Sequence, residues 1–171
     1  MHHDYMIVDA YNVINASSDL VQFQEISLEM SRERLISMMQ EYASYHDVNV
    51  IIVFDAWNSG RKMRTYENAG NVRVVFSRNG ETADSVIERM SRELVTAGFR
   101  VYVATSDKNE QDVIFGVGAL RKSARELINE CKAVPKKSTR HKDKPFSTAI
   151  AGRIDEEILM KLEQIGRLNE K

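Results

Sequence analysis

The stretch YMIVD, residues 5–9, is an apolar run that ends on a carboxylate. Three later runs have the same form, and each ends at an acidic residue or leads shortly into one. They are residues 50–54 with Asp55, residues 72–76 with Glu81 and Asp84, and residues 101–104 with Asp107. Helical patterns separate these β-branched runs. Alternation of this kind predicts an α/β fold with a parallel sheet.

The acids at these strand ends indicate a shared site. In an open parallel sheet the carboxyl ends of the strands lie along one edge, and ligands bind there. Carboxylates gathered at one place raise one another's pKa, and a cation between them relieves the repulsion. We therefore expect Asp9, Asp84 and Asp107 to hold Mg²⁺ or Mn²⁺, with the amide of Asn12 at the rim. Asp55 and Glu81 are further candidate ligands.

Each acid also has an ordinary structural interpretation. Asp9 and Asn12 could simply cap the turn that follows the first strand, and Asp107 could cap a helix. Glu81 and Asp84 would complement the dipole of the helix they precede. The metal-site prediction depends on the coincidence that every strand is followed by an acid at the same edge.

Composition excludes several other classes of protein. The chain has 171 residues with a net charge of -1, so no overall field selects a nucleic acid or a membrane. No apolar run reaches membrane-spanning length and the start lacks a signal-peptide core, which predicts a cytoplasmic protein. The single cysteine, Cys131, excludes a disulfide framework and is expected in the core. The histidines form no zinc pattern, and residues 116–121 lack the third glycine of a dinucleotide fingerprint.

Basic residues are concentrated in local groups that could hold phosphates. The candidate RNA-binding residues are Arg61, Lys62 and Arg64 on the loop after Asp55, and Arg121, Lys122 and Arg125 after the glycines. We expect one domain over residues 1–171, with a basic arm at about 132–146 and a last helix at about 155–168. Residues 12–26 and 57–70 are expected to be loops, and a helix is expected over about 119–131.

The motifs together resemble the NYN domains, a PIN-like ribonuclease group. The residues that carry the resemblance are IVDAYN at 7–12, VFDA at 53–56, ETAD at 81–84 and ATSD at 104–107. The stretch IFGVGALRKSARE at 114–126 is similar to the YacP-type branch. That branch includes an endoribonuclease that cuts mRNA in the ribosomal A site.

This resemblance implies a PIN-like open parallel sheet of order 3-2-1-4, allowing one extra strand, with helices on both faces. It implies dependence on Mg²⁺ or Mn²⁺, cleavage of RNA, and mRNA and the ribosome as partners. By matching position, Asp9, Asn12, Asp84 and Asp107 would be the active-site residues.

Two other functions compete with a metal-dependent endoribonuclease. One is a non-catalytic module that binds RNA or the ribosome through a degenerate site. The other is a receiver-like phosphoacceptor with Asp55 as acceptor and Lys108 as partner, although Ala10 stands where that fold usually has a second acid.

Overall fold

The structure is a computed structural model, and it describes residues 4–56, 65–107, 112–114 and 116–136. The chain divides into two compact units, Met1–Pro135 and Lys136–Lys171. The second unit lies outside the described residues except for Lys136, so the prediction of one domain over the whole chain stays a prediction. The expected helix at about 155–168 also lies outside the described residues.

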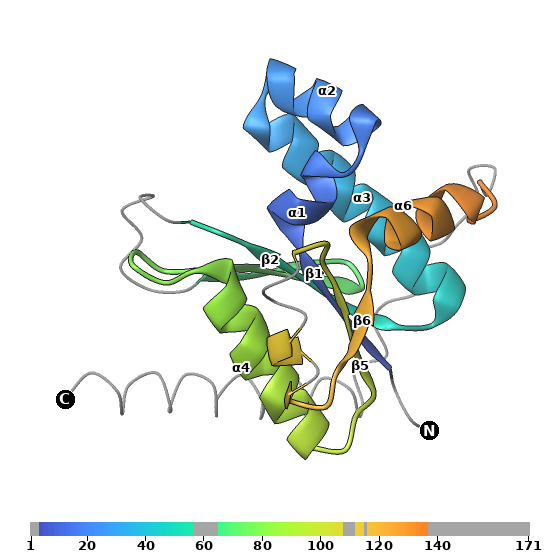
Figure 1. Ribbon diagram of the computed structural model, residues 1–171. Helices are drawn as coiled ribbons and strands as arrows, with labels where there is room; N and C mark the ends of the chain where they lie inside the picture. The colour runs from blue at the N-terminus through green and yellow to red at the C-terminus, as the bar shows by residue number, and fades with distance from the viewer. Residues whose placement is uncertain (1–3, 57–64, 108–111, 115, 137–171) are drawn as a thin grey trace. The chain divides into compact units, whose positions relative to one another are not determined.

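The elements of the first unit alternate between strands and helices (Figure 1). In chain order they are β1 (Tyr5–Asp9), α1 (Ala10–Asn15), α2 (Ser18–Ile26), α3 (Leu28–His46), β2 (Asn49–Phe54), β3 (Thr65–Ala69), β4 (Val72–Phe76), α4 (Ala83–Thr96), β5 (Val101–Ala104), β6 (Leu120–Lys122) and α6 (Ala124–Ala133). Residues 112–114 are also helical. No helix in the described ranges is long and apolar enough to cross a membrane.

The strands form one sheet in the order β3-β4-β2-β1-β5-β6. All neighbouring pairs are parallel except β3 and β4. The four strands foreseen from the sequence are β1, β2, β4 and β5, and their order β4-β2-β1-β5 confirms the predicted 3-2-1-4. The sheet gains β3 at one edge and β6 at the other. The five parallel strands do not follow the 2-1-3-4-5 order of receiver-like folds, which removes the phosphoacceptor alternative.

Two layers of helices cover the sheet, as the resemblance implied. Residues from α1, α2, α3 and α6 pack with one face of the sheet in a continuous apolar core, in which Val8, Leu35 and Ile52 are fully buried. On the other face α4 contacts β1, β2 and β5 through an apolar stripe that includes Ile87 and Leu94. Figure 1 shows α4 on the opposite side of the sheet from α1 and α3.

The prediction of an irregular loop over residues 12–26 was wrong, because α1 and α2 occupy it. The Ser17 hydroxyl caps α2 by accepting a hydrogen bond from the backbone N–H of Leu20. Leu20 is itself fully buried in the core. Both helices are short, so their apolar residues recur too few times to show a helical period.

Two edge strands were also missed. Residues 65–69 were expected in a loop, but they form β3, which pairs with β4 through a turn at Gly70. Residues 120–122 were expected at the start of a helix, but they pair with β5. Pairing with a neighbouring strand outweighs local propensity at both places. α6 instead begins after Ser123, whose side chain forms a capping box with Glu126.

Candidate metal centre

The site predicted from the strand ends lies at the carboxyl edge of the sheet, around Asp9. Asp9 is the last residue of β1, and Asp55 follows β2 in the adjacent position. Asp84 lies in the first turn of α4, where the Thr82 hydroxyl caps the helix by accepting from the backbone N–H of Ser85. Asp107 follows β5, the neighbour of β1 on the other side.

Asp9 is influenced by burial and by the other acids at this edge. Burial is the largest cause of a rise in the pKa of the Asp9 carboxyl from 3.8 to about 6. The negative charges of Asp84, Asp107 and Asp55 each raise this pKa further, while the Asn12 backbone N–H lowers it. Asp9 makes no capping hydrogen bond of ordinary geometry to α1. Burial, with repulsion from the neighbouring carboxylates, therefore outweighs the favourable contact with the Asn12 backbone N–H.

Asn12 connects α1 to the loop that carries Asp107. Its side-chain oxygen accepts a hydrogen bond of 2.7 Å from the backbone N–H of Ser106. The Ser106 hydroxyl in turn accepts from the backbone N–H of Ala124 at the start of α6. The buried Thr105 hydroxyl accepts from the backbone N–H of Asp107. The structure thus places Asn12 next to the site but uses its amide oxygen to hold the Asp107 loop.

Asp55 and Glu81 have partners of their own. The Ser77 hydroxyl donates to Asp55 at 3.4 Å and accepts from the backbone N–H of Ala56. Glu81 is buried and pairs with the Arg89 guanidinium at 3.0 Å. Asp55 acts on Asp9 electrostatically, whereas Glu81 is not among the main causes of the Asp9 shift. The structure therefore supports Asp55 as a neighbour of the site more strongly than it supports Glu81.

The chemistry of the donors fits a hard divalent cation. The side chains that gather around Asp9 offer carboxylate oxygens, which Mg²⁺ and Mn²⁺ prefer. Within the described ranges, no three His, Cys, Asp or Glu side chains are placed closely enough to hold a metal ion by themselves. Mg²⁺ usually keeps several waters and binds through one or two carboxylates. Acids that are spaced more widely than a three-ligand cluster, around the Asp9 carboxyl with its raised pKa, fit that mode of binding.

The predicted RNA-binding residues are distributed unevenly. Arg61, Lys62 and Arg64 lie outside the described residues. Arg121 on β6 and Arg125 on α6 are exposed. Lys122 is largely covered and forms an ion pair with Glu130 of α6. Lys122 therefore serves the packing of α6 against β6, and the exposed pair is the better candidate for contacting phosphates.

The first residue of the predicted basic arm belongs to α6. Lys132 lies in the last turn of α6, and its ammonium is 3.7 Å from the Asp19 carboxylate of α2. The part of the predicted arm from residue 137 onward lies outside the described residues.

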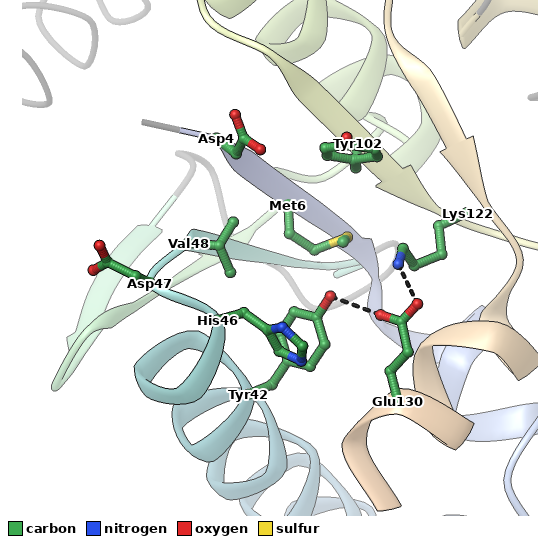
Figure 2. Close-up of a pocket in the computed structure, with 9 residues that line it drawn as sticks. All are labelled: Asp4, Met6, Tyr42, His46, Asp47, Val48, Tyr102, Lys122 and Glu130. Carbon is green, nitrogen blue, oxygen red and sulfur yellow. Dashed lines mark hydrogen bonds and ion pairs between the residues drawn. The ribbon is translucent and has the colours of Figure 1, made fainter. Parts of the chain in front are cut away.

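A cavity of about 510 Å³ opens near the amino end of β1, at the opposite end of that strand from Asp9 (Figure 2). Three of its polar side chains satisfy one another: the Tyr42 hydroxyl donates to Glu130 at 2.8 Å, and Lys122 donates to the other oxygen. Burial raises the pKa of Glu130, but the hydrogen bonds from Lys122 and Tyr42 outweigh it and leave the pKa lowered. These contacts join α3, β6 and α6 and have a structural role.

Cys131 has no catalytic character. It packs against the apolar core from α6, as expected from the sequence. Burial raises the pKa of its thiol to about 12, so the thiol stays protonated and is a poor nucleophile at neutral pH.

Sequence reasoning missed one cluster beside the acids. The Arg32 guanidinium of α3 donates two hydrogen bonds to the Tyr11 hydroxyl, at 2.6 and 3.1 Å. It also lies 5.5 Å from the ring centre of Phe54 and 5.7 Å from that of Phe76. In the sequence, an arginine flanked by other charges on an amphipathic helix looks like a solvated residue. No local pattern distinguishes Arg32 from Arg34.

An open parallel sheet with acids gathered at the carboxyl edge of its central strands defines a PIN-like α/β domain. A model of the YacP-like NYN domain matches residues 6–167, and the chain belongs to that family. NYN domains are a nuclease-type family.

The chain is also similar to proteins of known sequence or structure. It is 40% identical over 163 residues to "Uncharacterized protein YacP" of Bacillus subtilis (strain 168), covering 94% of this chain and 95% of that one. A crystal structure of Rae1 (YacP) from Bacillus subtilis matches with a TM-score of 0.66 and 38% identity, over 96% of this chain and 95% of that chain. A point-mutant crystal structure of the same protein matches with a TM-score of 0.68 and 40% identity, over 91% and 90%.

Proposed function

We propose that this protein is a divalent-metal-dependent endoribonuclease that cleaves RNA phosphodiester bonds at the carboxyl edge of its sheet. The observation that carries the proposal is the placement of acids at one edge of the sheet: Asp9 ends β1, and Asp55 and Asp107 follow the two neighbouring strands, β2 and β5. The charges of Asp84, Asp107 and Asp55 all act on the largely buried Asp9 carboxyl. Membership of a nuclease-type family supports the same activity.

The residues of the site divide into two roles. Asp9, Asp84 and Asp107 would hold Mg²⁺ or Mn²⁺, with Asp55 beside them. When bound, such a cation makes a water more acidic and stabilises negative charge on a phosphodiester. Asn12 positions the Asp107 loop through its hydrogen bond to Ser106. The Thr82 cap fixes the turn of α4 from which Asp84 projects.

The test compares cleavage of a labelled single-stranded RNA with Mn²⁺, with Mg²⁺ and with EDTA. We expect RNA cleavage only when a cation is present. The cleavage rate should fall at least about 100-fold in Asp9→Asn and in Asp107→Asn, because the bound cation activates the attacking water. The matched control is Asp47→Asn. Asp47 directly follows α3 as its C-terminal cap, and asparagine tolerates its left-handed backbone (φ 53°). Cleavage that persists in EDTA or in both variants would refute the proposed mechanism.

One observation favours a second function. The acids are not assembled as a three-ligand cluster in the described part of the chain, which is also expected of a non-catalytic module that binds RNA or the ribosome. The same experiment decides between the two, because such a module would bind RNA without cutting it under any metal condition.

We further propose mRNA on the ribosome as the substrate. The net charge of -1 provides little general attraction for free RNA, and Arg121 and Arg125 expose local positive charge on β6 and α6. A surface of this kind suits docking on a larger ribonucleoprotein better than capture of RNA from solution.

A further inference from the structure

Arg32 lies at the same edge of the sheet as the acids. Phe54 and Phe76 are the last residues of β2 and β4, and they are register partners. The Arg32 guanidinium lies over both rings and within 5.9 Å of the Tyr11 ring centre. Tyr11 comes two residues after Asp9, and Asp55 directly follows Phe54. A fixed positive charge therefore lies at the same edge of the sheet as the predicted cleavage site.

Side-chain alternation separates this charge from the acids by the thickness of the sheet. Val8 belongs to the core on the α3 side, so the next residue of β1, Asp9, turns toward the α4 side. Asp84 comes from α4 itself. An RNA strand that crosses the carboxyl edge of the sheet from the α4 side would reach the acids first and Arg32 next.

The way in which Arg32 is held leaves its charge available. Tyr11, a neutral group, accepts two of its hydrogen bonds. The carboxylate of Glu29 is 3.4 Å away but exposed, and exposed pairs of this kind contribute little. In the described ranges no buried carboxylate neutralises Arg32, although its side chain is only 22% exposed. Aromatic faces and a hydroxyl orient the planar guanidinium without cancelling its charge.

We propose that Arg32 binds a backbone phosphate of the RNA, adjacent to the phosphate at the acidic edge, and that Tyr11 orients its guanidinium. This inference rests on the proposed function, because it assumes that the RNA strand crosses the carboxyl edge of the sheet. The guanidinium fork matches phosphate oxygens, and a contact of this kind fixes the register of the strand without reading its sequence.

The experiment measures the affinity of a fluorescent single-stranded RNA over a range of salt concentrations, in the full-length protein carrying Asp9→Asn so that no cleavage occurs. Arg32→Gln should weaken binding about 10-fold at low salt and reduce the magnitude of the salt slope by about 0.7, the value for one phosphate contact with a single strand. Arg34→Gln is the matched control, because Arg34 is exposed on the same helix. We expect it to leave both quantities unchanged.

Two further variants separate binding from packing. Arg32→Lys keeps the charge and should retain the salt slope while losing part of the affinity. Tyr11→Phe keeps the ring and removes the acceptor, so it should weaken binding severalfold with an unchanged slope. If Arg32→Gln lowers only the thermal stability and binds RNA like Arg34→Gln, or if Arg32→Lys loses as much slope as Arg32→Gln, the inference is overturned.

The outcomes also separate this inference from the proposed function. Arg32-dependent binding by a wild-type protein that cuts no RNA with Mg²⁺ or Mn²⁺ would remove the nuclease proposal and leave the phosphate contact in place. If the wild type and Arg32→Gln cut RNA with a metal ion and have the same KM and the same salt slope, the phosphate contact would be refuted and the nuclease proposal would stand.

Discussion

Asp9 shows how function and stability oppose each other at a single residue. Its carboxyl is buried among the charges of Asp84, Asp107 and Asp55, and its pKa is raised to about 6 in the folded protein. Because the pKa is 3.8 in the unfolded chain, ionised Asp9 lowers the free energy of unfolding. That loss is complete above about pH 6 and disappears as the pH falls below 3.8.

In EDTA at pH 7.5, Asp9→Asn should therefore be more stable than the wild type. At about 1.4 kcal/mol per pKa unit, the gain should be at most about 3 kcal/mol, and it should shrink toward pH 4. Thermal unfolding of both proteins across this pH range measures the difference, with Asp47→Asn as control. Adding Mg²⁺ should stabilise the wild type more than Asp9→Asn. Equal stability of the two proteins at every pH would show that neither burial nor the neighbouring acids raise the pKa of Asp9.

At the scale of the element, helix caps and short loops place the site residues. Asp84 depends on the first turn of α4, and Thr82 is the cap of that turn. Asp107 depends on a loop held from two sides, by Asn12 of α1 and by the first turn of α6. The first of these hydrogen bonds cannot be inferred from the sequence, because Asn12 and Ser106 are 94 residues apart.

Thr82→Ala should destabilise the protein by about 1 kcal/mol, the usual cost of losing a helix cap. It should also reduce metal-dependent cleavage several-fold, because the turn that carries Asp84 would fray. Thr82→Ser keeps the oxygen acceptor and should restore both properties, as measured by chemical denaturation and by the cleavage assay. A loss of stability in Thr82→Ala with full activity would show that Asp84 does not need the cap.

At the scale of the whole molecule, the net charge of -1 predicts slow and poorly selective cutting of naked RNA. We expect faster cutting of the same mRNA when it is loaded on a translating ribosome. The comparison uses the intact protein and a variant with Lys136, Lys137, Arg140, Lys142 and Lys144 neutralised. Lys132→Ala is the matched control, since Lys132 belongs to α6 and pairs with Asp19. Equal rates on free and loaded mRNA would contradict the ribosome proposal, and full activity of the neutralised variant would move the docking surface elsewhere.

The central sheet and the position of its acids followed from the sequence alone. Strands β1, β2, β4 and β5 are mostly apolar runs in which nearly every residue is buried, so their pattern is local and nearly continuous. An acid after each run then lies at the carboxyl edge in any parallel sheet, and the charges that act on Asp9 agree with that expectation. The match of the family model over residues 6–167 agrees with the motifs quoted from residues 7–126.

Other features were decided only by the tertiary structure, because they depend on contacts between residues far apart in the chain. β3 and β6 are strands because β4 and β5 offer them hydrogen bonds. Glu81 and Lys122 carry the right charges for a metal and for RNA, but Arg89 and Glu130 neutralise them. Arg32 resembles a solvated helix residue until the fold brings Tyr11, Phe54 and Phe76 against it. A sequence pattern shows which groups a segment carries, and packing determines which of those groups remain available to a ligand.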